Sequence, residues 1–138
     1  MTQPHRLPGF APLLHRYDGF ILDIWGVLHD GLRPYPGAIA CLRSLHAAGK
    51  RVVLLSNAPR RAAATAAGMA SMGFTPDLFA AIITSGEITH RLLAARREPF
   101  FKALGREVYH RGPGRDRNLL DGLDLSLVPR VGDAAFIL

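Results

Sequence analysis

Apolar segments of strand length alternate with segments of helical periodicity along this chain, and this alternation restricts the folds open to it. Residues 20–24 and 51–55 are short apolar runs that end in polar residues, as buried strands do. Between them, residues 36–48 place apolar side chains at helical spacing, and Gly49 follows where a helix would end. Strand, helix and strand in this order predict a βαβ unit.

A second unit of the same kind follows the first. Residues 60–72 are rich in alanine and come directly after Pro59, which suits the first turn of a helix. Residues 80–83 indicate another short strand, and residues 87–97 another helix, whose start we expect Glu87 to cap. Two crossover connections in succession imply a parallel sheet, so we expect an α/β fold with a Rossmann-like arrangement.

The organisation changes near residue 98. A short strand is predicted at residues 106–110, a weak helix at 118–123, and an apolar strand at 134–138, where the sequence given ends. Chain termini are usually polar and weakly constrained, whereas this one reads Ala-Ala-Phe-Ile-Leu. We therefore expect an interrupted domain.

The composition of the chain narrows the classes of protein and of binding partner that fit it. Of the 138 residues, 49% are hydrophobic and 20% are charged, which indicates one globular domain. The net charge of +6 raises the question of nucleic acid, but the Arg and Lys residues are scattered without interleaved aromatic side chains. No apolar run approaches the ~18 residues that span a bilayer, and a single cysteine, Cys41, is typical of a reducing compartment. We expect a cytoplasmic protein that binds neither nucleic acid nor membrane, and a homo-oligomer stays open.

The end of the first strand carries a carboxylate. The apolar run that starts at Phe20 ends on Asp23, and the segment breaks at Gly26. In open α/β sheets, ligands bind in the crevice beyond the carboxyl ends of the strands. Asp23 is therefore placed for chemistry.

The residues that begin at Asp23 read Asp-x-x-Gly-Val-Leu and are followed by Asp30 and Gly31, which resembles the first motif of the haloacid dehalogenase (HAD) superfamily. The resemblance implies that Asp23 is a nucleophile forming an aspartyl-phosphate. It also implies a second Asp at position 25 as general acid/base, where this chain has Trp25. Indole cannot shuttle a proton. His29 or Asp30 could replace that acid, although a solvated loop histidine and an Asp-Gly turn are the commoner interpretations.

A hydroxyl and an amide end the second strand. Ser56 and Asn57 precede a predicted helix, whose N-terminus favours an anion, so they could hold a phosphate beside Asp23; alternatively they only cap the helix that starts near Pro59. Together with Asp23 they are similar to HAD motifs I and II. With Ile-Thr-Ser-Gly-Glu at residues 83–87, the pattern resembles class IIA, whose members include nitrophenyl-phosphatase-like proteins and phosphatases of sugar phosphates or nucleotides.

The resemblance also implies a magnesium ion. Its ligands would be the Asp23 carboxylate, the backbone carbonyl of Trp25 and an acidic residue further along the chain. A Lys and an acidic Gly-Asp loop should follow the cap, and neither Lys102 nor Asp133 fits these roles in position. We therefore expect residues 1–98 to be the N-terminal part of the catalytic core, and residues 99–138 to begin an inserted C2-type cap that is truncated.

Three functions stay open at this point. The first is a Mg²⁺-dependent phosphatase that acts on a small-molecule phosphate ester, of the sugar phosphate or nucleotide class, through an aspartyl-phosphate on Asp23. The second is an inactive fragment or pseudo-enzyme that serves binding or assembly, since these 138 residues are expected to lack a complete active site. The third is HAD chemistry other than phosphate hydrolysis, such as dehalogenation, which the aromatic Trp25 suggests.

Overall fold

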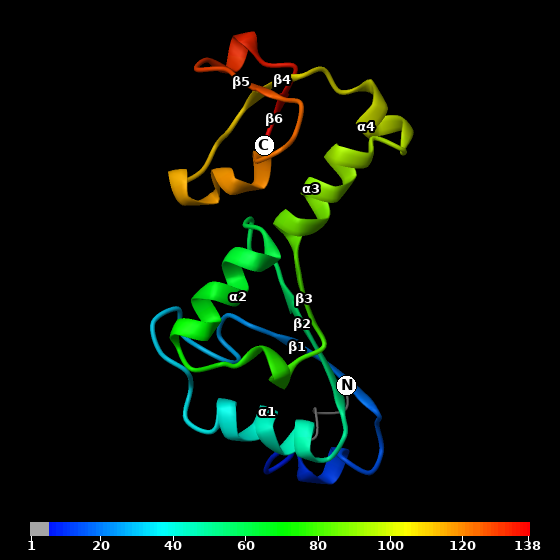
Figure 1. Cartoon of the computed structure of the whole chain (residues 1–138), viewed down its shortest axis with the longest axis vertical. Helices are drawn as coiled ribbons and strands as arrows, with labels where there is room; N and C mark the ends of the chain where they lie inside the picture. The colour runs from blue at the N-terminus through cyan, green and yellow to red at the C-terminus, as the bar shows by residue number, and fades with distance from the viewer. Residues whose placement is uncertain (1–5) are drawn as a thin grey trace. The chain divides into compact units, whose positions relative to one another are not determined.

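The computed structural model describes residues 6–138, which divide into two compact units (Figure 1). The first unit holds the described residues up to Ser56 together with Ala66–Ile82, and the second holds Asn57–Thr65 together with Ile83–Leu138. Among the described residues, no helix combines the length and the apolar character that crossing a bilayer requires.

The first half of the chain follows the predicted alternation of strand and helix. Strands β1 (Gly19–Asp23) and β2 (Arg51–Ser56) flank helix α1 (Ala38–Ala47), and helix α2 (Ala62–Ser71) and strand β3 (Ala81–Thr84) follow. The strands form one sheet in the order β1-β2-β3, in which β1 and β2 are parallel. Short 3-10 helices lie at Ala11–Leu13 and Pro76–Leu78. The predicted α/β fold with a parallel sheet is confirmed.

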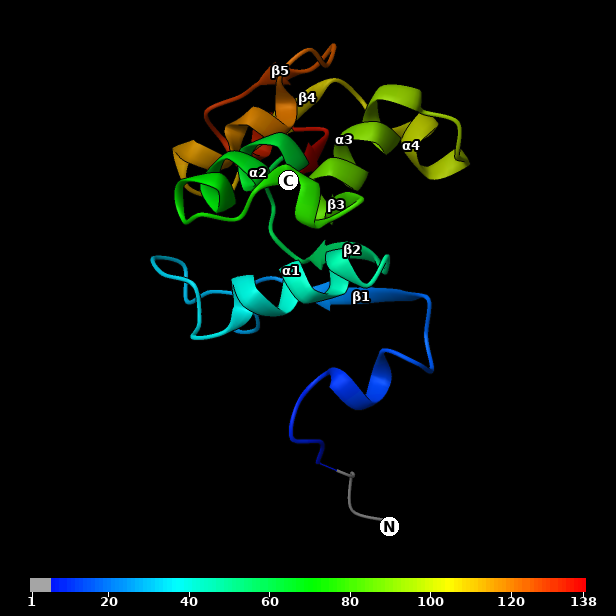
Figure 2. The ribbon, with the colours of Figure 1, turned by 60° about the horizontal axis from the view of Figure 1, so that its bottom comes forward.

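Helix α1 packs against strand β2 and places the core of the first unit there (Figure 2). Leu42 and Leu45 of α1 and Val52 and Leu54 of β2 are all buried in one cluster. Burial of each such side chain stabilises the fold by about 1.5–3 kcal/mol. The helix ends as predicted, since Gly49 follows it with a positive φ of 68° that glycine adopts without strain. This packing holds the strands whose ends carry the predicted site residues.

Strand β1 differs from the prediction of a fully buried strand. Ile21 is 72% exposed, and burial alternates along the strand. The reason is its place in the sheet, where β1 is an edge strand with β2 as its one neighbour among the described residues. The apolar run predicted a strand correctly, but hydrophobicity alone does not tell which strands a chain leaves at an edge.

The second unit is built around another short parallel sheet. Strand β4 (Glu107–Tyr109) lies between β5 (Ser126–Leu127) and β6 (Phe136–Ile137), and it is parallel to both. The helices of this part are α3 (Ser85–Ala95) and α4 (Pro99–Ala103), with 3-10 helices at Gly114–Leu120 and Val131–Asp133.

The prediction for the second half was right for the long elements and incomplete for the short ones. Helix α3 and strands β4 and β6 lie where strand and helix patterns predicted them. Lys102 stands in the short helix α4. Strand β5 was not predicted, since two residues carry no periodicity. The division into a core at 1–98 and a cap at 99–138 stays a prediction.

Candidate active site

The predicted nucleophile stands at the end of an edge strand. Asp23 is the last residue of β1 and its side chain is exposed. Its Oδ1 accepts a hydrogen bond of 2.8 Å from the backbone N–H of Ile24, which holds one carboxylate oxygen against the strand end. The carboxylate is therefore accessible and oriented.

Ser56, a predicted phosphate contact, lies at the end of the neighbouring strand β2. Asp23 pairs with Leu55 in the parallel register, so Ser56 lies one residue beyond the partner of Asp23. Ser56 is 7% exposed and ends β2. The structure thus brings the predicted nucleophile and this hydroxyl to adjacent ends of two parallel strands. Asn57 is exposed and belongs to the second unit.

The alternative role for Ser56 and Asn57, capping the helix near Pro59, is wrong. Helix α2 begins only at Ala62, several residues beyond Asn57. The backbone N–H of Ala62 donates instead to Oε2 of Glu87, at 3.2 Å. The partner of this first N–H of α2 is therefore a residue of a different helix.

Glu87 is the centre of a buried polar network in the second unit. Glu87 is the third residue of α3 and does not cap that helix, so this prediction was wrong: the helix begins at Ser85, and the cap is the side chain of Thr84, which accepts from the N–H of Glu87. The carboxylate of Glu87 accepts instead from the N–H of Ala62, at the start of α2. Arg61 Nε and Arg91 Nε donate to that carboxylate at 2.7 Å and 3.1 Å. The hydrogen bond from Arg61, followed by those from Ala62 and Arg91, lowers the pKa of Glu87 from 4.5 to about 2, against the opposing effect of burial. Glu87 is a structural residue and not a member of the site.

We expect Glu87→Gln to lower the free energy of unfolding at pH 7 by about 2 kcal/mol, because Arg61 and Arg91 lose a charged partner. The lowered pKa of Glu87 means that its stabilising effect is complete above pH 4.5 and is lost as the pH falls toward about 2. Urea unfolding of both proteins across this range should show the difference narrowing with acid. The exposed Glu98→Gln is the control, and an equal loss there would contradict the assignment.

The loop after β1 is held by an aromatic and histidine cluster. The indole of Trp25 lies against Gly31, where any Cβ would collide with the ring, and its ring centroid is 5.9 Å from that of His29. His29 is 6% exposed and its Nδ1 accepts from the N–H of Gly31 at 2.9 Å, so Nε2 carries the proton. Burial lowers the pKa of His29. The interpretation of His29 as a solvated loop residue is wrong.

Asp30 acts as the predicted turn residue. Its Oδ1 accepts from the N–H groups of Leu32 and Arg33, at 2.8 Å and 2.7 Å. These backbone hydrogen bonds, the one from Arg33 foremost, lower the pKa of Asp30. Oδ1 of Asp30 and Nδ1 of His29 are thus both engaged by backbone N–H groups of the loop. That either side chain replaces the general acid stays a prediction.

The magnesium site that the resemblance implies stays a prediction. No group of three or more His, Cys, Asp or Glu residues lies close enough to bind a metal within residues 6–138. Magnesium nevertheless often binds through one or two carboxylates and completes its octahedron with water and phosphate oxygens. The exposed carboxylate of Asp23 and the backbone carbonyl of Trp25 are oxygen donors of the right kind from one loop. They fit a magnesium ion that relies on further oxygen ligands.

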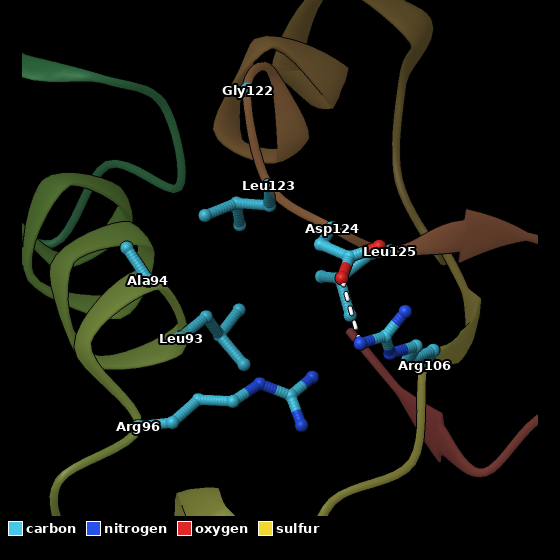
Figure 3. Close-up of a pocket in the computed structure, with 8 residues that line it drawn as sticks. All are labelled: Leu93, Ala94, Arg96, Arg106, Gly122, Leu123, Asp124 and Leu125. Atoms are coloured by element: carbon cyan, nitrogen blue, oxygen red, sulfur yellow. Dashed lines mark ion pairs between the residues drawn. The ribbon is translucent and has the colours of Figure 1, made fainter.

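Two pockets lie within the second unit. One, of about 350 Å³, is lined by Arg96, Arg106 and Asp124 among others (Figure 3), and Arg106 pairs with Asp124 at 2.9 Å. Arg96 donates to the carbonyls of Leu104 and Gly105, so the charged groups of this pocket are already engaged. The other, of about 240 Å³, is lined by Asn57 together with Ser85, His110, Arg111 and other residues. This pocket includes the predicted site residue Asn57.

Comparisons with known proteins show the family of the chain. Residues 20–126 match the family described as haloacid dehalogenase-like hydrolase. The chain is 34% identical to human chronophin over 98% of its own length and 47% of that protein. A HAD-like hydrolase from Brucella suis shares 33% identity with a TM-score of 0.78, covering 99% of this chain and 48% of that one. A glycerol phosphate phosphatase from Mycobacterium tuberculosis, solved with calcium, shares 26% identity with a TM-score of 0.56, covering 88% and 34%.

The matches cover different shares of this chain and of its relatives. It spans about half the length of the relatives it matches, while the matches cover nearly all of its own length. The matched segment includes Asp23, Trp25, Ser56 and Asn57. The chain belongs to the haloacid dehalogenase-like hydrolases, in their class IIA branch.

Proposed function

We propose that this chain carries the nucleophile and the first phosphate contacts of a Mg²⁺-dependent phosphate monoester phosphatase. The observation that supports this most strongly is the register of β1 and β2, which sets the exposed carboxylate of Asp23 beside the strand end of Ser56. A phosphate between two such ends meets a nucleophile and a hydroxyl donor together. Asn57 follows as a further donor.

In the proposed reaction, an oxygen of Asp23 attacks phosphorus and the bond from phosphorus to the ester oxygen breaks. The ester oxygen keeps the electron pair and takes a proton from water. Water then attacks the aspartyl-phosphate, which releases inorganic phosphate and a proton and regenerates the carboxylate. Ser56 and Asn57 orient the phosphoryl group by donating to its oxygens, and such positioning supplies most of the catalysis in phosphoryl transfer.

A divalent cation beside Asp23 would neutralise the negative charge that otherwise opposes the approach of two anions. The Asp23 carboxylate and the Trp25 carbonyl would hold it. The Mycobacterium tuberculosis phosphatase was solved with calcium, an ion that prefers oxygen ligands as magnesium does. That relative acts on glycerol phosphate by its name, and it supports a small-molecule phosphate ester, of the sugar phosphate or nucleotide class, as substrate here.

The test is phosphate release from 4-nitrophenyl phosphate by the purified protein that carries this chain. We expect release that requires added Mg²⁺, stops when EDTA removes the metal, and returns when Mg²⁺ is restored in excess. Acid quenching during turnover should also leave phosphate on the peptide that contains Asp23. Release that is indifferent to EDTA would contradict the proposal, as would halide release from a 2-haloacid without any phosphate release.

A further inference from the structure

We propose that His29 is a positioning residue, which holds the loop after β1 so that the backbone carbonyl of Trp25 stays open to a divalent cation. This inference rests on the proposed function, because that carbonyl is one of the two proposed magnesium ligands. It adds a residue that is itself no ligand of the metal and that acts through the peptide group carrying one.

The carbonyl of Trp25 is left open by the hydrogen bonds of its own loop. The preceding carbonyl, of Ile24, accepts from the N–H groups of Val27, Leu28 and His29, at 3.3, 2.8 and 3.4 Å. By contrast, no backbone N–H group in the described part of the chain donates to the carbonyl of Trp25. This oxygen is therefore available to a cation, whereas the oxygen of Ile24 is already engaged.

The orientation of this open carbonyl is set by His29. The N–H of Gly26 belongs to the same peptide group as the carbonyl of Trp25, and it donates to the carbonyl of His29 at 2.9 Å. The C=O and N–H bonds of a trans peptide point in opposite directions, and the described residues contain no cis peptide bond. The carbonyl of Trp25 therefore points away from that of His29. Gly26 makes this turn possible, since its φ of 79° lies in the left-handed region that glycine enters without strain.

The side chain of His29 anchors its backbone in the first unit. The residue is 6% exposed, and its ring lies against the rings of Trp25 and Phe74, with centroids 5.9 Å and 6.4 Å away. Phe74 is part of the buried core of this unit. Nδ1 of His29 also accepts from the N–H of Gly31 at 2.9 Å. A ring that is buried, packed and hydrogen-bonded in this way leaves its own carbonyl little freedom to move.

A fixed carbonyl matters for a cation such as magnesium. Mg²⁺ demands near-ideal octahedral geometry, and a ligand that is oriented before binding loses little conformational entropy when the ion arrives. Groups that orient a metal ligand without touching the metal typically change the affinity about 10- to 100-fold when they are removed. Loss of the anchor at His29 should therefore weaken metal binding, and excess metal should restore the reaction.

The test compares two amides at position 29 by their affinity for Mg²⁺, measured by calorimetry on the purified protein that carries this chain. The amide oxygen of His29→Asn lies where Nδ1 lies in histidine and keeps an acceptor for the N–H of Gly31. The longer His29→Gln carries its oxygen past that place. We expect the Kd for Mg²⁺ to stay within about threefold of the parent in His29→Asn and to rise about tenfold in His29→Gln.

Phosphate release gives a second measurement on the same variants. The Mg²⁺ concentration that gives half-maximal release from 4-nitrophenyl phosphate should rise about tenfold in His29→Gln, while kcat at saturating Mg²⁺ should stay within about twofold of the parent. Leu45→Ala is the control for lost stability, because it removes a buried side chain of the same core from the last turn of α1. We expect it to lower the melting temperature and to leave the Kd for Mg²⁺ unchanged.

A third measurement needs no substitution and decides the inference even if His29→Gln does not fold. Mg²⁺ on the carbonyl of Trp25 would polarise the whole peptide group, so titration of the parent with Mg²⁺ should shift the amide resonance of Gly26 in an NMR spectrum. An unshifted Gly26 amide in a protein that binds Mg²⁺ would overturn the inference.

The remaining outcomes separate the inference from the proposed function. If both amides bind Mg²⁺ as the parent does, if both weaken binding equally, or if Leu45→Ala weakens it as much as His29→Gln, the positioning role is overturned. The proposed function still stands in these cases, provided that the parent binds Mg²⁺ and that Asp23→Asn weakens this binding. If the parent binds no Mg²⁺, the proposed metal site fails and the inference fails with it.

Discussion

Asp23→Asn should lower the Mg²⁺-dependent release of phosphate from 4-nitrophenyl phosphate by at least about 10³-fold, because an amide oxygen is far too weak a nucleophile to form the covalent intermediate. The loss should fall on kcat, since the change leaves the proposed phosphate contacts Ser56 and Asn57 in place. The trapped phosphate on the peptide containing Asp23 should also disappear. Initial rates and acid-quench labelling on the same preparations measure both effects.

The control for this change is Asp18→Asn in the turn just before β1. Asp18 is an exposed carboxylate that pairs with Lys50 at 3.3 Å, and surface pairs of this kind contribute little to stability. We expect its kcat to stay within about twofold of the parent, since the change leaves the site intact. A similar loss of activity in both variants would show that negative charge near β1 matters generally, and a small loss in Asp23→Asn alone would remove Asp23 from the mechanism.

The parts of the fold that the sequence predicted are those in which local pattern and packing agree. In helix α1, Leu42 and Leu45 recur at helical spacing and face the apolar strand β2, so periodicity alone reveals both elements. The strand end at Asp23 was predictable for the same reason, because a polar residue closes an apolar run. Parallel pairing then brings Ser56 to the adjacent end, which follows from topology without knowledge of any contact.

The parts that escaped prediction depend on contacts between residues far apart in the sequence. Glu87 caps helix α2 from the first turn of α3, and nothing near Ala62 in the sequence indicates that partner. His29 looked like a solvated loop residue, but Trp25, Gly31 and Phe74 surround it. A signal was present in the apolar character of this loop, since solvated loops seldom carry Trp, Val, Leu and Tyr together. Strand β5 is too short for any local pattern.

The replacement Trp25→Asp should raise the rate of phosphate release from alkyl esters, whereas Asp23→Asn lowers the rate of phosphate release. A carboxyl group at position 25 would supply a proton to the departing oxygen, and general acid catalysis is worth about 10²- to 10⁴-fold. We therefore expect kcat for an alkyl ester such as glycerol phosphate to rise by at least about 10²-fold, whereas kcat for 4-nitrophenyl phosphate, whose leaving group needs no proton, should change little. The ratio of the two rates in parent and variant measures this effect.

The matched control is Trp25→Asn, which has nearly the same size and polarity as Trp25→Asp but no acidic proton. If the gain comes from proton donation, Trp25→Asn should leave the rate for glycerol phosphate at the parent level. The rate of Trp25→Asp should also fall as the pH rises and the new carboxyl group loses its proton, because only the protonated form donates. An equal gain in both variants, or a gain without this dependence on pH, would mean that removal of the indole, and not the new acid, raises the rate.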